Sequence, residues 1–277
     1  MDIVQAVTLG LVQGLTEFLP VSSTAHLTLA PWVFGWQDPG LTFDVALHVG
    51  TLVAVAAYFG QDLWQMLVHG LRSLVKRDWS DPYQRLAWLV VIGCVPAIVA
   101  GVLLNKYIAG PLRSPLVIAA AMAGVGILMG VAEKLAKHER PLDTLTVKNA
   151  LLIGLAQACA LIPGTSRSGA TMTMALFLGF MRPDAARYSF LLGFPVILGS
   201  AVFKLKDLAH EPALAAALPM MAVGVVVSAV SGYVCIRFLM NYLQKYTLMP
   251  FVAYRVLLGL AIAGAVAAGV PVPQAAD

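Results

Sequence analysis

The chain has 277 residues, of which 60% are hydrophobic and 12% are charged, and its mean hydropathy is +0.83. A soluble domain carries about 25% charged residues, so this composition excludes an ordinary soluble protein and indicates an integral membrane protein. The net charge of +4 does not indicate nucleic-acid binding, because the basic residues lie in short loops between apolar segments. We expect one all-α membrane domain over residues 1–277.

Six apolar segments are long enough to cross a bilayer, which takes about 20 apolar residues in a helix. They are residues 41–61, 84–105, 114–135, 185–205, 213–240 and 250–270. The polar stretch 62–83 is predicted to include an amphipathic helix that lies on the cytoplasmic membrane surface. The sequence thus predicts six transmembrane helices.

Two further apolar stretches are interrupted near their middles. Residues 1–33 are interrupted at Pro20-Val21-Ser22-Ser23, and residues 146–181 at Pro163-Gly164-Thr165-Ser166. A proline followed by Gly, Ser or Thr ends one helix and caps the next. Irregular backbone survives at membrane depth only inside protein or beside a water-filled cavity. We therefore predict two re-entrant helical hairpins, with kinked spanning helices as the alternative.

The interrupted stretches also resemble each other. Residues 19–26 align with 162–169 at an offset of 143, residues 10–13 with 154–157 at 144, and residues 62–63 with 207–208 at 145. This pattern predicts a duplication, with repeats of approximately 1–140 and 141–277. Each repeat then holds one hairpin and three spans. Because three is odd, the second repeat is expected to be inverted in the membrane.

The basic residues predict the orientation of the chain. One face collects thirteen of them, against four on the other, and the positive-inside rule places the richer face in the cytoplasm. Both termini and the mouth of the first hairpin are then expected outside. The richer face comprises Arg72, Lys76, Arg77, Arg85, Lys134, Lys137, Arg140, Lys148, Arg182, Arg187, Arg237, Lys245 and Arg255, and the other Lys106, Arg113, Lys204 and Lys206.

Three ionisable residues stand out at membrane depth in the interrupted stretches: Glu17, His26 and Arg167. A charge at membrane depth costs about 3 kcal/mol on insertion scales and usually marks function, although a polar residue that joins two helices is the alternative. Gln13 and Glu17 are four apart and share a helix face, and Ser23 and His26, three apart, are expected to share another.

The residues around both breaks suit an anion. Helices that begin after Pro20 and after Pro163-Gly164 present free N–H groups and the positive ends of their dipoles. Arg167 adds a fork of donors that binds phosphate bidentately, and Gly164 and Gly169 allow the backbone to approach a ligand. Both breaks also offer hydroxyls, at Ser22, Ser23, Thr24, Thr165, Ser166, Ser168 and Thr171. The sequence therefore predicts a site for phosphate or diphosphate.

Glu17 needs a partner other than phosphate, because a carboxylate repels it. It either binds a divalent cation such as Mg²⁺ or Ca²⁺ or transfers protons. Ser23 and His26 are a possible nucleophile–base pair, and His26 alone is a possible nucleophile or acid. Asp44 and His48 form an i,i+4 pair near the outer mouth and are weaker candidates.

Residues 13–26 (QGLTEFLPVSSTAH) and 163–171 (PGTSRSGAT) resemble the two motifs of the undecaprenyl-diphosphatase family, also known for bacitracin resistance. The resemblance implies a bacterial inner-membrane enzyme, often dimeric, whose outward-opening site removes the terminal phosphate of a polyprenyl diphosphate and regenerates the lipid carrier for cell-wall synthesis. It also implies a required divalent cation, with Glu17 as the better ligand than Gln13, where the family often has Glu. The implied functional core is Glu17, Ser23, His26 and Arg167, with Ser22, Ser166, Ser168 and Thr171 around the phosphate.

A transporter is the competing class. Inverted repeats with broken helices at the midplane are also how secondary transporters bind substrates. An anion carrier or lipid-phosphate flippase would need Arg167 and the helix N-termini, but would have less use for Glu17, Ser23 and His26. Release of phosphate from a polyprenyl diphosphate distinguishes the two classes.

Overall fold

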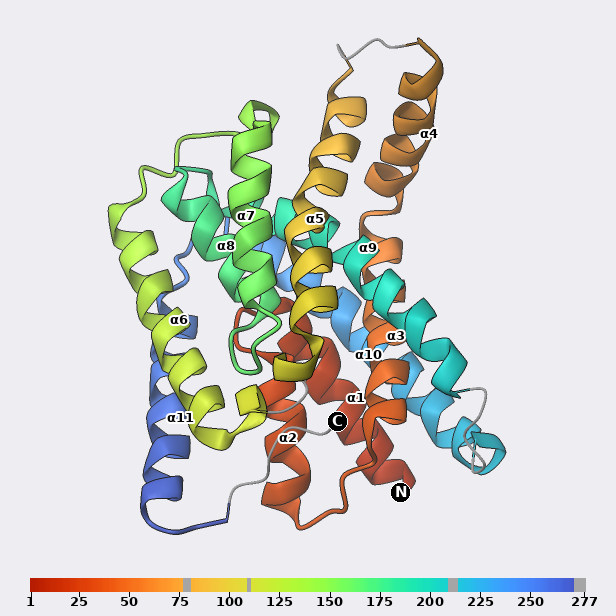
Figure 1. Ribbon diagram of the computed structural model, residues 1–277, viewed down its shortest axis with the longest axis vertical. Coiled ribbons are helices and arrows are strands. Elements are labelled where there is room, and N and C mark those ends of the chain that lie inside the picture. Colours follow the sequence, from red (N-terminus) through yellow and green to blue (C-terminus); the bar gives the residue numbers. More distant parts are fainter. Residues whose placement is uncertain (77–80, 109–110, 209–213, 272–277) are drawn as a thin grey trace.

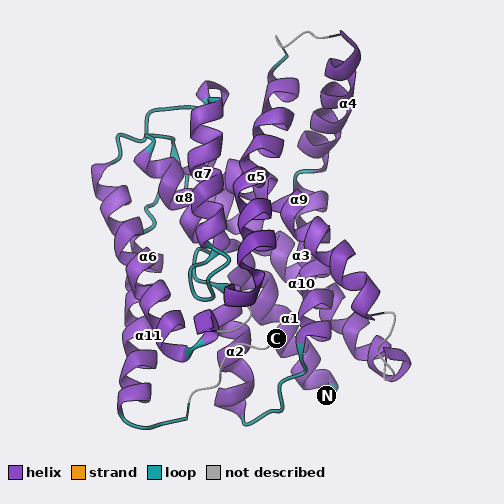
Figure 2. Cartoon of the chain, viewed as in Figure 1, coloured by secondary structure: helices purple, strands orange, loops and turns teal. Residues whose placement is uncertain are grey.

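The computed structural model describes residues 1–76, 81–108, 111–208 and 214–271, which form helices without a β-sheet (Figures 1 and 2). The α-helices are α1 (Ile3–Phe18), α2 (Ser23–Phe34), α3 (Leu41–Tyr58), α4 (Gly60–Lys76), α5 (Pro82–Ile108), α6 (Pro115–Leu135), α7 (Val147–Cys159), α8 (Arg167–Phe177), α9 (Arg182–Leu208), α10 (Leu214–Tyr242) and α11 (Met249–Ala267). Short 3₁₀ turns, η1 (Pro111–Arg113) and η2 (Leu142–Thr144), precede α6 and α7.

Five of the six predicted segments form helices that are long and apolar enough to cross a membrane, namely α5, α6, α9, α10 and α11. The first predicted span corresponds to α3, and the chain bends by 81° between α3 and α4. The structure has a sixth candidate span only if α3 and α4 are counted together as one bent span. The predicted amphipathic helix is α4, whose Trp64, Leu67 and Leu71 form an exposed apolar stripe. The chain is therefore a multi-pass membrane protein.

Both interrupted stretches form helical hairpins rather than kinked helices. The chain reverses after α1 and again after α7, and α2 packs against α1 as α8 packs against α7 (Figure 1). The two breaks are irregular, and the second is the loop near the centre of Figure 2. Helix α1 ends at Phe18, directly before the predicted break at Pro20, where proline cannot donate a helical hydrogen bond. Helix α7 ends at Cys159, four residues before Pro163.

The two hairpins pack in a similar way against long helices from the other half of the chain. Helix α1 lies on α10, and α7 lies on α5. Glycines meet at both contacts: a Cβ on Gly10 would lie 3.0 Å from the carbonyl oxygen of Gly224, and one on Gly154 would overlap the carbonyl of Gly93. These close approaches bring the tips of both hairpins to the interior of the molecule (Figure 1).

Candidate active site

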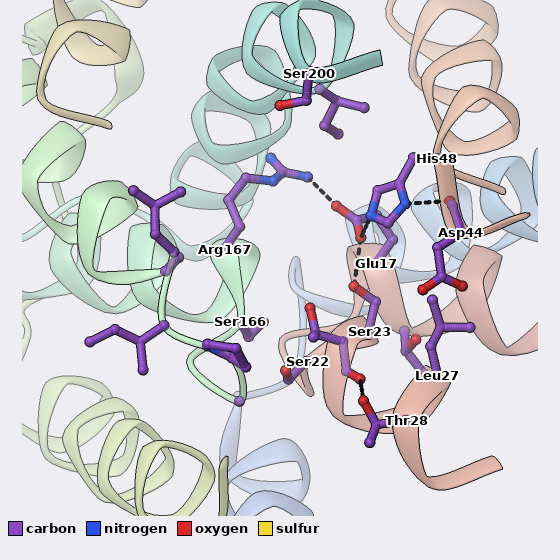
Figure 3. A pocket seen from close by; sticks show the side chains of 18 of the residues that line it. Glu17, Ser22, Ser23, Leu27, Thr28, Asp44, His48, Ser166, Arg167 and Ser200 are labelled. Carbon is purple, nitrogen blue, oxygen red and sulfur yellow. Dashed lines mark hydrogen bonds and ion pairs between the residues drawn. The ribbon is translucent and has the colours of Figure 1, made fainter. Parts of the chain in front are cut away.

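The two hairpin breaks border a cavity of about 340 Å³, which α3 and α9 complete (Figure 3). The first hairpin contributes predicted site residues from the end of α1 and the start of α2, and the second contributes them from the start of α8. Of the residues predicted to be catalytic or to bind phosphate through a side chain, six line the cavity: Glu17, Ser22, Ser23, Thr24, Ser166 and Arg167. Ser22 and Ser23 of the first break correspond to Ser166 and Arg167 of the second break, at an offset of 144 residues. Equivalent residues of the two breaks therefore line the same cavity.

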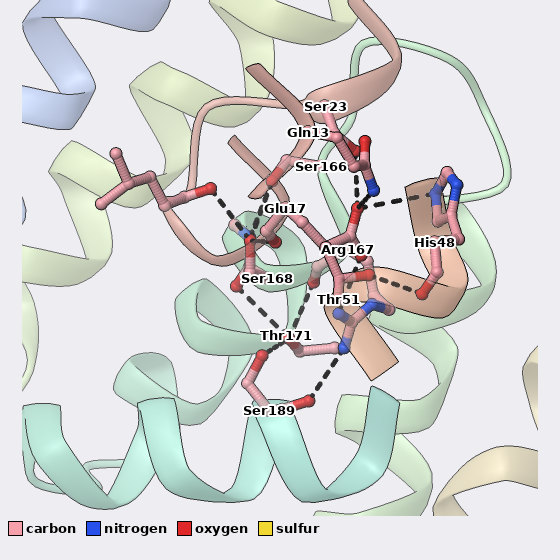
Figure 4. A network of polar contacts seen from close by, with 12 residues as sticks. Gln13, Glu17, Ser23, His48, Thr51, Ser166, Arg167, Ser168, Thr171 and Ser189 are labelled. Carbon is pink, nitrogen blue, oxygen red and sulfur yellow. Dashed lines mark hydrogen bonds and ion pairs between the residues drawn. The ribbon is translucent and has the colours of Figure 1, made fainter. Parts of the chain in front are cut away.

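Glu17 is the centre of a polar network at this cavity (Figure 4). Its Oε1 accepts a hydrogen bond of 3.0 Å from Arg167, and its Oε2 accepts one of 2.7 Å from the Ser23 hydroxyl. Gln13 donates to Oε2 over 3.2 Å, and Nε2 of His48 lies 3.7 Å from the same oxygen. The carboxylate is buried, so this set of partners balances the cost of removing its charge from water.

The Arg167 side chain passes close to α9 at a glycine before it reaches the cavity. One terminal nitrogen donates to the carbonyl of Ser189 over 3.1 Å, while the other donates to Glu17. A side chain at Gly193 of α9 would overlap the guanidinium. Gly193 is therefore a site residue that the sequence did not single out, because a glycine within a span has no local signal of such a role.

The N-termini of α2 and α8 begin with the same unusual backbone. Their N-cap residues, Ser22 and Ser166, have φ values of 76° and 69°, a region that residues other than glycine rarely adopt. The offset is 144, so the sequence alignment at 143 paired Ser22 with the wrong residue, Thr165. Strain of this kind costs about 1–3 kcal/mol per residue and is typical of functional sites. Both helices begin at residues that line the cavity, and the first turn of a helix has N–H groups that no helical carbonyl accepts.

Four other predicted site residues lie behind the cavity wall. The Ser168 hydroxyl bonds to the carbonyls of Glu17 and Leu19, each over 3.2 Å, and joins the hairpin tips. Thr171 contacts the Ser189 hydroxyl over 2.6 Å. The N–H of Gly169 donates to Ser166, and Thr165 offers its carbonyl to a buried arginine. These residues shape the breaks and do not line the cavity.

His26 lies outside the cavity lining, which includes Arg167, and the Ser23 hydroxyl donates to Glu17 rather than to His26. Its Nδ1 bonds to the carbonyl of Ser22 over 2.7 Å, and its Nε2 bonds to the Tyr254 hydroxyl over 2.6 Å. Successive helix residues are 100° apart. The cavity takes the face of α2 that carries Ser23, Thr24, Leu27 and Thr28, so Ser23 lies at its edge and His26 falls beyond it.

Arg255 was predicted to lie on the cytoplasmic face, and this prediction was wrong. Its side chain is fully buried between the hairpins. It donates to the carbonyl of Pro20 in the first break over 3.1 Å. It also donates to the carbonyls of Gly164 and Thr165 in the second break, over 3.0 and 2.9 Å. Two further acceptors are the carbonyls of Ala121 and Met122 in α6. One guanidinium therefore ties both breaks together.

Comparison with known proteins identifies the family of this chain. Residues 6–261 match the family model described as "Bacitracin resistance protein BacA". The chain belongs to this family. A protein of Geobacter metallireducens named undecaprenyl-diphosphatase is 47% identical over 263 residues, covering 95% of this chain and 97% of that protein. One from Hahella chejuensis with the same name is 50% identical over 94% of this chain and 96% of that protein. The BacA resemblance inferred from the two motifs is confirmed.

The divalent cation expected for a BacA protein fits the donors at this cavity. Gln13 does not line the cavity, but its Oε1 is buried without a hydrogen-bond partner, and Nε2 of the same amide donates to the Glu17 carboxylate. Asp44 adds a second carboxylate to the lining. Hard oxygens of this kind suit Mg²⁺ or Ca²⁺, and Mg²⁺ commonly uses one or two carboxylates together with substrate phosphates. Within the described part of the chain no three His, Cys, Asp or Glu side chains group as a metal site, so phosphate oxygens would complete the coordination.

Four lining residues of this BacA site were weakly indicated or missed. Asp44 and His48 line the cavity from α3, as their i,i+4 spacing allows. Arg113 of η1 and Ser200 of α9 also line it, although nothing in their local sequence distinguishes them from ordinary residues near span ends. His48 is the closest of the four to the Glu17 network.

Proposed function

We propose that this protein hydrolyses the terminal phosphate of undecaprenyl diphosphate, or of a related polyprenyl diphosphate, to give the monophosphate lipid carrier. The observation that carries the proposal is the convergence of Ser23, Glu17 and Arg167 on one cavity at two helix N-termini. The relatives named undecaprenyl-diphosphatase, 44–50% identical over nearly the whole chain, support the substrate class.

Arg167 and the N-termini of α2 and α8 bind the diphosphate in this mechanism. The bonds to Ser189 and Glu17 use two of the five guanidinium N–H groups, which leaves donors for phosphate oxygens. As charge develops on the terminal phosphoryl group, these donors stabilise it more strongly than water does, because they are already oriented.

Ser23 is the nucleophile, and Glu17 is its base. The hydroxyl proton already points at Oε2 over 2.7 Å, so it passes to the carboxylate as the Ser23 oxygen bonds to phosphorus. The bond from phosphorus to the bridging oxygen breaks, and the lipid monophosphate leaves with the electron pair. Water then attacks the phosphoserine and releases phosphate, and the proton on Glu17 returns to Ser23.

Glu17 and the Gln13 carbonyl are the groups that would hold a divalent cation with the substrate. When bound, the cation neutralises charge on the diphosphate and lowers the repulsion between phosphate and carboxylate. Glu17 would keep its hydrogen bond to Ser23 through Oε2, and the buried Gln13 oxygen, which has no hydrogen-bond partner, would be free to bind the cation. This use of Gln13 follows from its position one helical turn before Glu17.

The orientation proposed from the basic residues places the cavity on the outer side of a bacterial inner membrane, together with both termini. The lining supports this, since Arg113 and Asp44 lie near span ends on the face with few basic residues. The two re-entrant hairpins and the matching packing of α1 and α7 support an inverted repeat. The lipid tail would lie between apolar helices, and a homodimer remains a prediction from the family.

Phosphate release from farnesyl diphosphate by purified full-length protein tests the proposal, with and without Mg²⁺. Wild type should release phosphate, while Ser23→Ala and Arg167→Ala should lower turnover by about 100-fold or more. Arg237→Ala, which removes an exposed arginine of α10, is the matched control and should keep its activity. Substrate that is bound or moved across vesicles by wild type without phosphate release would contradict the phosphatase and favour a transporter.

A further inference from the structure

Tyr254 of α11 and His26 of α2 form a contact that the proposed chemistry does not use. The hydroxyl of Tyr254 lies 2.6 Å from Nε2 of His26. Their rings also stack, with centroids 5.6 Å apart and an angle of 12° between the planes. The contact joins two helices that are more than 200 residues apart in the sequence, and it lies outside the cavity lining.

The other ring nitrogen of His26 holds the carbonyl of Ser22. A carbonyl oxygen only accepts hydrogen bonds, so Nδ1 carries the proton and Nε2 accepts the bond from the tyrosine hydroxyl. Both nitrogens of the neutral ring are therefore used by protein groups. This arrangement suits a fixed hydrogen-bonding link better than a group that exchanges protons with a substrate.

Ser22 has an unfavourable backbone conformation in the first break. Its φ of 76° is strained, and its side chain makes no capping bond to the helix that follows. Its carbonyl also accepts the backbone N–H of His26 over 3.3 Å. Rotation of this peptide unit would redirect the first N–H groups of α2 and the hydroxyl of Ser23, which is the next residue.

Arg255, the residue after Tyr254, contacts the same break at another residue. It donates to the carbonyl of Pro20 over 3.1 Å, two residues before Ser22. Consecutive side chains of α11 therefore fix both ends of the strained segment. Arg255 acts directly on the backbone, whereas Tyr254 acts through His26.

We propose that Tyr254 is a positioning residue: through the His26 imidazole it fixes the Ser22 carbonyl, and so orients the N-terminus of α2 and the Ser23 hydroxyl toward the phosphoryl group. His26 is then also a positioning residue, and transfers no proton and forms no bond to phosphorus. The inference rests on the proposed function of the cavity, but it concerns a different set of atoms.

Two substitutions of His26 separate positioning from acid–base or nucleophilic catalysis. In His26→Asn the side-chain amide places an N–H near the position of Nδ1 and still reaches the Ser22 carbonyl, but it has no group that accepts a proton at neutral pH. In His26→Phe the stacked ring remains and both hydrogen bonds are lost. Tyr254→Phe removes only the hydroxyl, and Tyr246→Phe is the control at an exposed tyrosine.

Variants that keep the hydrogen bond to the Ser22 carbonyl should release phosphate from farnesyl diphosphate faster than variants that lose this bond. We expect His26→Asn to keep at least about a tenth of the wild-type kcat/KM and an unchanged pH profile, and His26→Phe to lose about 100-fold. Tyr254→Phe should lose about five-fold, the factor of one ordinary hydrogen bond, and should lose nothing more in the His26→Phe background. Equal loss in His26→Asn and His26→Phe would overturn the inference and make His26 a catalytic residue.

Binding of a non-hydrolysable methylene analogue of farnesyl diphosphate, measured by calorimetry on the same proteins, makes the two proposals separable. Wild type that binds the analogue but releases no phosphate would defeat the proposed function alone. Positioning by Tyr254 would still require weaker binding by His26→Phe than by His26→Asn. Equal affinity in these two variants would overturn it, provided that both unfold at similar temperatures.

Discussion

Replacing Arg255 with methionine should destabilise the protein and its site together. The substitution keeps much of the side-chain volume and removes the donors that hold the breaks. The carbonyls of Ala121 and Met122 keep their places in the hydrogen bonding of α6, but those of Pro20, Gly164 and Thr165 lose a buried donor. Each unsatisfied carbonyl costs about 1 kcal/mol at the lower end of the usual range, which gives about 3 kcal/mol in total.

Thermal unfolding in detergent measures this loss. A change of about 3 kcal/mol corresponds to a decrease in Tm of about 6–12 °C for a protein of this size. Displacement of the breaks by about 1 Å should also lower kcat/KM for farnesyl diphosphate by about 100-fold. Arg255→Lys should fall between wild type and Arg255→Met, because one ammonium group cannot reach both breaks.

The control is Arg237→Met at an exposed position of α10, which should leave Tm and kcat/KM close to wild type. If Arg255→Met unfolds within about 2 °C of wild type, the three carbonyls do not depend on the guanidinium. If it is destabilised as expected but fully active, the breaks keep their shape without it. Either result refutes the role given to Arg255.

Three further predictions concern the cavity and its wall. Glu17→Gln should lower kcat by about 100-fold or more, since the amide does not accept the Ser23 proton, and a loss below about three-fold in phosphate release would contradict its role as base. Chelation by EDTA should stop phosphate release, and Gln13→Glu should lower the Mg²⁺ concentration for half-maximal activity by about ten-fold; an unchanged Mg²⁺ titration would remove Gln13 from the cation site. Thr171→Val leaves the Ser189 hydroxyl without its partner and should cost about 1–3 kcal/mol in unfolding experiments, with a smaller effect on KM than Arg167→Ala.

Local chemistry made the hairpins predictable from the sequence. Pro20 and Pro163-Gly164 interrupt helices wherever they occur, and charges within apolar sequence are costly enough to mark a site. The resulting predictions placed Glu17, Ser23 and Arg167 correctly around one cavity. The offset between the repeats was uncertain by one residue, because two short motifs with different residues do not define a register without backbone angles.

Long-range contacts account for what the sequence did not reveal. Arg255 was assigned to the cytoplasmic face by its place near the end of a span, yet its acceptors Pro20 and Gly164 are 235 and 91 residues away. His26 was expected beside Ser23 because residues three apart are neighbours on a helix. The packing of α2 against the rest of the protein determines which of its residues line the cavity, and no local sequence pattern predicts this packing. The same holds for Gly193, whose role depends on the path of Arg167.

The structure of the protein with the methylene analogue of farnesyl diphosphate and Mg²⁺ tests the shared cavity most directly. We predict the diphosphate between the two breaks, with Arg167 bound to its oxygens and the terminal phosphorus about 3–3.5 Å from the Ser23 oxygen. A diphosphate bound at another surface, or in this cavity with its terminal phosphorus out of reach of Ser23, would contradict the account.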